Sequence, residues 1–163
     1  MATEPGAGGP RIRHLDELPW QEVRRQRHGE RIVSVREKWP EFSPRYLSVY
    51  ARYDPGVVVQ AHGHNSDHLV FVIEGEVTCG DVRCPAGTHI ALDRGDTFGP
   101  FVAGPEGATL FEVMMGDPRS WGDEPEAFAR VLAERGVEPL PDPPLEYPPW
   151  LQDLRTHWGA TTE

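Results

Sequence analysis

The chain has 163 residues, 38% of them hydrophobic and 26% charged, which is typical of a soluble globular protein with a single domain. Its 26 acidic and 16 basic residues give a formal net charge of −10, so phosphate backbones and anionic membrane surfaces repel it. We therefore expect no nucleic acid and no membrane among its partners.

The first residues lack the apolar core of an export signal, and no window of about 18 residues is apolar enough to cross a membrane. Without an export signal, Cys79 and Cys84 are expected to be reduced thiols in a cytoplasmic protein. A short hairpin loop between the two cysteines would not place them directly opposite each other, which argues against a redox pair.

Residues 1–30 are predicted to form an irregular N-terminal arm, because only isolated apolar residues stand among charged and turn residues there. From 31 to 116, short apolar runs alternate with glycine and proline turn signals at intervals of roughly eight to twelve residues. This pattern predicts an all-β fold, either a sandwich or a barrel. The expected strands are 31–37, 45–53, 57–62, 68–74, 76–79, 82–84, 88–92, 99–103 and 108–115.

Residues 117–163 are predicted to be a C-terminal extension with short helical segments and a proline-rich stretch over 139–149. Asp123 is the expected N-cap of a first helix, and Gly136 is expected to end it. A last short helix would place Trp150, Leu154 and Trp158 on one face.

Residues 56–75, GVVVQAHGHNSDHLVFVIEG, contain three of the seven histidines. Alternate residues of a strand face the same side, so His62 and His64 are expected to face together with Gln60. A turn through residues 65–67 would let a neighbouring strand begin at His68, and the three imidazoles would then converge. Such a cluster predicts one bound divalent transition metal, iron, zinc, nickel or manganese, with coordination positions left open. The alternative is that the histidines are ordinary packed side chains.

This stretch resembles the first motif of the cupin superfamily, as found in small RmlC-like proteins. That motif is a glycine, five residues, HxH, three or four residues, a glutamate, six residues and a glycine. The chain has all of these spacings, with one histidine where the family has glutamate. The matching residues are Gly56, His62, His64, His68 and Gly75.

The second cupin motif is degenerate in this chain. Gly87 and Gly95 stand at the motif's glycines, but Asp93 replaces its proline and Phe98 replaces its metal-binding histidine. The resemblance covers residues 45–115. It implies an antiparallel double-sheet β-barrel of the cupin or jelly-roll type, with a metal bound by His62, His64 and His68. Loss of the glutamate disfavours Mg²⁺ and Ca²⁺, and Phe98 would place an apolar wall beside the ion.

Further candidates for a substrate pocket are Gln60, Phe98, Tyr50, Arg52 and Glu112, and no catalytic residue is singled out. Glu112 is charged within the apolar run TLFEVMM, where strand alternation favours an outward side chain over one that reaches the cavity. Tyr50 and Arg52 share one strand face. Facing inward they would bind a polar or anionic substrate, and facing outward they would be solvated.

Three functions are compatible with these features. The first is a metal-dependent enzyme acting on a small polar or anionic organic molecule, an oxidoreductase such as a dioxygenase with iron and a lyase or isomerase with other metals. The second is a non-enzymatic module that binds a small molecule or a metal for sensing or storage, and the third is an assembly barrel with vestigial histidines. Open coordination positions favour the enzyme.

We also expect a homodimer, because the exposed edge strands of a small barrel are costly to leave unpaired and two-fold dimers are the commonest closed assemblies.

Overall fold

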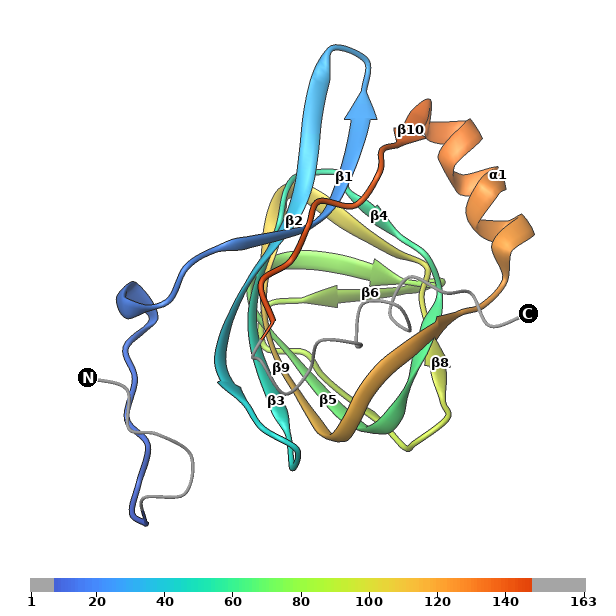
Figure 1. Cartoon of the computed structure of the whole chain (residues 1–163). Helices are drawn as coiled ribbons and strands as arrows, with labels where there is room; N and C mark the ends of the chain where they lie inside the picture. Colours follow the sequence, from blue (N-terminus) through green and yellow to red (C-terminus); the bar gives the residue numbers. More distant parts are fainter. Residues whose placement is uncertain (1–7, 148–163) are drawn as a thin grey trace.

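The structure, a computed structural model, describes residues 8–147 (Figure 1). A 3-10 turn at Leu15–Glu17 precedes ten strands and one α-helix, α1, which comes between the last two strands. The bounds are β1 Gln21–His28, β2 Arg31–Phe42, β3 Leu47–Tyr53, β4 Val58–Val59, β5 His62–Cys79, β6 Val82–Pro85, β7 His89–Leu92, β8 Thr97–Phe98, β9 Phe101–Gly122, α1 Pro125–Arg135 and β10 Val137–Pro139.

All strand pairs are antiparallel, which confirms the predicted all-β fold. The strands curl around one interior (Figure 1), and the main hydrogen-bonded path runs β10-β1-β2-β3-β9-β5-β6. Two long strands, β5 and β9, pair along most of their length with three register shifts. They carry β4, β7 and β8 as side branches, so the strands form one sheet whose path does not close.

The core consists of the inward residues of β2, β3, β5 and β9. Along β3, Val49, Ala51 and Tyr53 are buried while the residues between them face out, as expected for period-2 alternation. Burial of these apolar side chains stabilises the fold by roughly 25 cal/mol per Å² removed from water. The largest fully buried apolar side chains are Phe101, Leu47, Leu110, Val35, Val49, Val57, Val58, Val70, Val72 and Val77.

The prediction of an irregular arm over residues 14–30 is wrong at Gln21–His28, which forms β1 between β2 and β10. Val23 is the one apolar residue of this strand, so the sequence has no hydrophobic alternation to indicate it. Backbone pairing on both edges stabilises β1, together with buried Gln26, whose side-chain amide hydrogen-bonds both polar backbone groups of Val58. The sheet also extends past residue 116, because β9 continues to Gly122.

The helix α1 begins one residue later than expected. Asp123 accepts a hydrogen bond from the backbone N–H of Glu124, and Glu124 rather than Asp123 occupies the N-cap position, in a left-handed conformation. The predicted end is confirmed, since Gly136 is left-handed and its N–H bonds back into the last turn. The expected last helix with Trp150, Leu154 and Trp158 lies outside the described residues.

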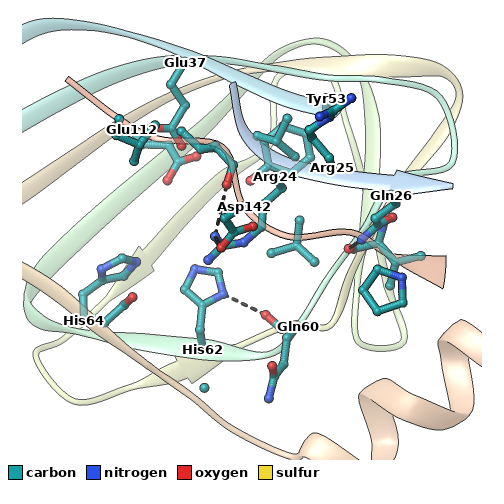
Figure 2. Close-up of a pocket in the computed structure, with 18 of the residues that line it drawn as sticks. Arg24, Arg25, Gln26, Glu37, Tyr53, Gln60, His62, His64, Glu112 and Asp142 are labelled. Atoms are coloured by element: carbon teal, nitrogen blue, oxygen red, sulfur yellow. Dashed lines mark hydrogen bonds and ion pairs between the residues drawn. The ribbon is translucent and has the colours of Figure 1, made fainter. Parts of the chain in front are cut away.

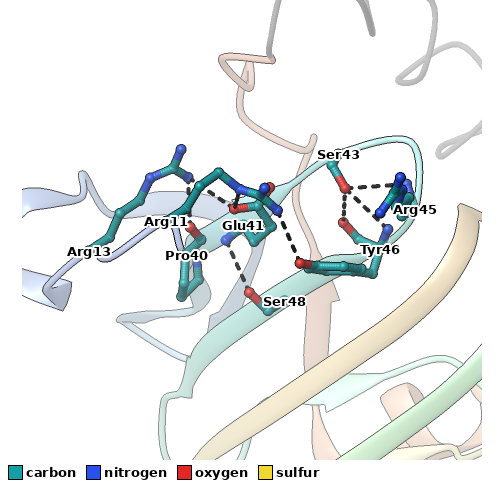
Figure 3. Close-up of polar contacts among 8 residues, drawn as sticks. All are labelled: Arg11, Arg13, Pro40, Glu41, Ser43, Arg45, Tyr46 and Ser48. Atoms are coloured by element: carbon teal, nitrogen blue, oxygen red, sulfur yellow. Dashed lines mark hydrogen bonds and ion pairs between the residues drawn. The ribbon is translucent and has the colours of Figure 1, made fainter. Parts of the chain in front are cut away.

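The N-terminal segment is tied to the outer end of the β2–β3 hairpin (Figure 3). Arg11 pairs with Glu41 at 3.0 Å and donates to the Tyr46 hydroxyl, while Arg13 donates to the carbonyl of Pro40. Among residues 8–147, no helix has the length and apolar character needed to span a membrane. Cys79 and Cys84 are free thiols and lie diagonally across the β5–β6 pair, as expected.

Gly75 ends the first cupin motif at a close approach between β5 and β9. Its φ is +66°, and a Cβ there would lie 2.0 Å from the carbonyl oxygen of Gly107. Gly87 shares a positive φ, but a Cβ there would meet nothing within 4 Å.

We expect Gly75→Ala to lower the free energy of unfolding by about 1–2 kcal/mol for the left-handed backbone and by roughly 1–3 kcal/mol more for the clash. Gly87→Ala is the control and should show only the first loss. Urea unfolding of both variants measures the difference, and equal losses would contradict the close approach.

Candidate functional site

The three histidines lie along one strand, β5, and face the same interior. The residues from His62 to Val72 alternate, with the even-numbered ones turned inward, so the predicted turn at 65–67 is wrong and period 2 alone brings the rings together. The ring centroids of His62 and His64 are 5.1 Å apart, and those of His64 and His68 are 4.8 Å apart.

The glycine between His62 and His64 has a packing reason. A Cβ on Gly63 would lie 2.7 Å from the carbonyl oxygen of Asp96 and 2.8 Å from the Trp121 ring. A side chain at this position would therefore push apart the strands that flank the two histidines. The HGH sequence thus reflects tight packing behind the site as well as the facing of the imidazoles.

His62 and His64 are held in the same tautomer by backbone carbonyls. The Nδ1 atoms donate to the carbonyl oxygens of Gln60 and Pro118, both at 2.8 Å, which leaves each Nε2 without a proton. Burial and the neighbouring histidines lower the pKa of His62 to about 3 and that of His64 to about 4. Both imidazoles are therefore neutral at physiological pH, the form that binds metals.

His68 is paired with Glu112 through its Nε2. Its Nε2 lies 2.9 Å from Glu112 Oε2, and the two residues are only 1% and 8% exposed. Its Nδ1 is buried without a hydrogen-bond partner. The expectation that Glu112 faces outward is wrong, because Leu110, Glu112 and Met114 are the inward residues of β9.

Phe98, at the position of the missing second-motif histidine, packs against the cluster. Its ring centroid is 4.8 Å from that of His62, 5.3 Å from that of His68 and 4.6 Å from that of Phe101. An aromatic ring here displaces water from one side of the imidazoles, so this side is apolar.

A cavity of about 320 Å³ opens beside the histidines (Figure 2). Its volume is near the lower end of the range for small-molecule sites. His62, His64, Gln60 and Glu112 line it, whereas Tyr50 and Arg52 do not, because they fall on the outward side of β3. Sequence reasoning missed the opposite wall, where the polar lining residues include Arg24, Arg25, Gln26, Glu37, Tyr53 and Asp142.

Glu37 is an acid in this wall. Its burial, reinforced by the negative charge of Glu112, raises its pKa from 4.5 to about 7, although the indole N–H of Trp39 donates to it at 2.8 Å. The same two causes hold the pKa of Tyr53 well above its ordinary value. The cavity therefore contains a carboxyl group that changes protonation state near neutral pH.

The histidines fit a metal ion in chemistry but only in part in geometry. Neutral imidazoles with free Nε2 atoms are suitable ligands, and two of the three histidines provide them. Within residues 8–147, however, no three histidine, cysteine, aspartate or glutamate side chains are arranged to hold an ion together. For the third donor, His68 offers only its Nδ1, because its Nε2 and the Glu112 carboxylate are engaged in their mutual hydrogen bond.

No family model and no curated protein matches this sequence. Among solved structures, an RmlC-like cupin from Shewanella frigidimarina matches with a TM-score of 0.54 at 17% identity, covering 66% of this chain and 92% of that one. The chain has a cupin fold. A proposed acetylacetone dioxygenase from Methylibium petroleiphilum matches over 97% of this chain and 100% of that one, with a TM-score of 0.60 and 12% identity.

A third match is an iron(II) protein, Fe(II)-HppE, solved with an alternative substrate. Its TM-score is 0.52 at 18% identity, and the match covers 66% of this chain and 60% of that one. At these identities the likeness shows the fold, so the chemistry has to be argued from the residues described above.

Replacing Glu37 by Gln is expected to stabilise the protein at alkaline pH. A carboxyl group with a raised pKa contributes stability that is fully present below about pH 4.5 and is lost as the pH rises through about 7. The variant should therefore gain roughly 1–3 kcal/mol over wild type at pH 8.5 and little at pH 4.5. Urea unfolding at the two pH values, with Glu138→Gln on exposed β10 as the control, measures this. An equal effect at both pH values would contradict the raised pKa.

Proposed function

We propose that this cupin is a metal-dependent protein that acts on a small polar or anionic organic molecule. His62 and His64 would hold one divalent transition ion through Nε2, with His68 or Glu112 as the third ligand. The bound ion would supply an open coordination position and Lewis-acid chemistry, with oxidative chemistry if it is iron.

The observation that carries the proposal is the presence of two neutral imidazoles with free Nε2 atoms on the wall of a cavity. Their tautomers are fixed by the carbonyls of Gln60 and Pro118, as is usual for histidines that bind metals. A histidine without a binding role would not need to be buried, neutral and held in one orientation by backbone carbonyls. The cavity gives a small molecule access to the same two rings.

Other residues of the chain have roles that need no metal. Phe98 keeps water from one side of the rings, which strengthens electrostatic interactions there. Glu37 faces the same cavity, and its pKa near 7 suits it to hold or transfer a proton at neutral pH.

A second candidate is a non-enzymatic sensor or storage module. The pairing of His68 with Glu112 favours it, because the described residues then offer no complete set of three ligands. A cytoplasmic location and the absence of nucleic acid as a partner stay predictions.

We expect the variant His62→Ala/His64→Ala to lose bound metal while it keeps its fold. Elemental analysis of protein purified without a histidine tag should give close to one transition ion per wild-type chain and only background for the variant. A variant without the exposed His14 and His89 is the control. Unchanged metal content in the double variant, with an unchanged circular dichroism spectrum, would contradict the assignment.

Turnover separates the enzyme from the sensor. Apo-protein loaded separately with Fe²⁺, Zn²⁺, Ni²⁺ or Mn²⁺ is screened against small organic acids and diketones, with dioxygen uptake and product formation as readouts. Ligand binding without turnover under every metal would favour the sensor.

We also propose a homodimer, formed through the outward side of β5 and β9. Several large apolar residues there are exposed, and Phe71 and Phe111, 42% and 38% exposed, are direct cross-strand partners. Monomers rarely leave such apolar clusters in water, and two-fold dimers are the commonest assemblies that cover them. The exposed residues of this face are Leu69, Phe71, Ile73, Phe111 and Met115.

Light scattering at micromolar concentration should give the mass of a dimer. The variant Phe71→Glu/Phe111→Glu should be monomeric, because burying two carboxylates opposes association. Ile32→Glu, on exposed β2 outside this face, is the control and should stay dimeric. A monomeric wild-type protein would refute this interface.

A further inference from the structure

A β-bulge in β1 turns an arginine into the cavity. Glu22 pairs with Arg36 and Arg24 pairs with Val35, so Val23 is an extra residue in β1. Val23 and Arg24 line the cavity at this bulge, and Arg25 and Gln26 line it further along the strand, although adjacent residues of a regular strand face opposite sides. Bulges of this kind commonly re-aim a side chain beside a functional site.

The Arg24 side chain reaches into the cavity from the wall opposite the histidines. In Figure 2 its side chain extends toward His62, and a dashed line joins it to Asp142. Arg24, His62 and Glu37 all line this cavity, so the positive charge of Arg24 acts on both of the other groups. This is the charge that an anionic ligand would meet next to the histidines.

Asp142 is the present partner of Arg24. Its Oδ2 lies 2.5 Å from Arg24 Nη1, and the two side chains are 34% and 40% exposed. Ion pairs this exposed are weak, and they typically shift an equilibrium by less than about fivefold. A ligand carboxylate that binds Arg24 with two parallel hydrogen bonds can therefore replace the Asp142 carboxylate.

Asp142 belongs to a strap, residues 139–147, that crosses the open side of the cavity. The strap is held on both sides of Asp142. Leu140 N–H donates to the Arg25 carbonyl, and two hydrogen bonds join Gln21 to the backbone of Glu146. The exchange of Asp142 for a ligand thus needs only a local movement within a strap whose ends stay in place.

We propose that Arg24 is the anion-binding residue of the cavity and that it takes the carboxylate of a small organic acid in exchange for Asp142. This inference rests on the proposed function, because it names the class of molecule presented to the histidines. One guanidinium matches a monocarboxylate in charge. A dianionic phosphate would meet Glu112 and Asp142 and would need a second cation, but the other lining arginine, Arg25, is paired with Glu22 at 3.4 Å.

The rest of the cavity lining suits the uncharged, hydrocarbon part of such an acid. Several of its lining side chains are apolar, so a hydrocarbon or aromatic body would be buried while its charged end stays on Arg24. The opposite end of the molecule would then face His62 and His64. The apolar lining residues include Val23, Val58, Trp121, Phe128, Leu140 and Leu145.

The test measures the binding of benzoate, acetate and the neutral benzamide to chelator-treated full-length protein by calorimetry. Benzoate should bind wild type more tightly than benzamide. Arg24→Gln should weaken benzoate at least about tenfold, as expected for loss of a charge-assisted hydrogen bond. Asp142→Asn should tighten it by up to about fivefold, because the competing carboxylate is gone.

The control uses another arginine of β1 that pairs with the same C-terminal segment. Arg27 lies 3.3 Å from Glu138 and does not line the cavity, so Arg27→Gln and Glu138→Gln should leave benzoate affinity unchanged. Equal weakening by Arg24→Gln and Arg27→Gln would overturn the proposal, as would the absence of binding of both benzoate and acetate to wild type.

The two proposals fail in different ways. The titration contains no metal, so carboxylate binding that depends on Arg24 would stand even if elemental analysis found no ion in the wild-type protein. Conversely, a metal bound by His62 and His64 together with no effect of Arg24→Gln would remove the anion site alone.

Discussion

The pairing of β5 with β9 determines what faces the interior of this protein. The two strands align from His62 opposite Gly122 to Cys79 opposite Phe101, and this register brings the inward residues of both strands to one side. His68 stands opposite Met114 and Val70 opposite Glu112, so the His68 imidazole and the Glu112 carboxylate meet diagonally across the pair. A slip of one residue would turn all of these side chains outward. The histidine cluster and its carboxylate thus depend on the same register that buries the apolar core.

A side chain of the site could be assigned to the inward face from the sequence only where the spacing of residues along its strand distinguishes the two faces. His62, His64 and His68 are separated by even numbers of residues, so their common facing was expected even though the turn assumed between them does not exist. In TLFEVMM both alternating series are largely apolar, so strand alternation does not indicate that Glu112 faces inward. Tyr50 and Arg52 were undecided for a similar reason, and buried Val49, Ala51 and Tyr53 show which face of β3 is internal.

The opposite wall of the cavity lay beyond sequence reasoning for a different reason. The charged sequence of β1 forms a strand because it pairs with β2 and β10. A bulge at Val23 then sets the direction in which Arg24 faces. Neither the pairing with β10, more than a hundred residues away in the chain, nor the bulge leaves a local signal.

Near neutral pH, most ionisable groups described in the cavity are either held in a neutral form or paired with an opposite charge. His62 and His64 are neutral because burial lowers their pKa values to about 3 and 4, and Glu37 is partly protonated because its pKa is raised to about 7. Arg24 and Asp142 neutralise each other at the mouth. An acid that displaced Asp142 would keep this balance while it brought its body against the imidazoles. The barrel strands thus supply the histidines, and the segments before and after them, β1 and the 139–147 strap, supply the charge that would select the ligand. This division agrees with the general rule that a fold provides the scaffold and that added segments determine specificity.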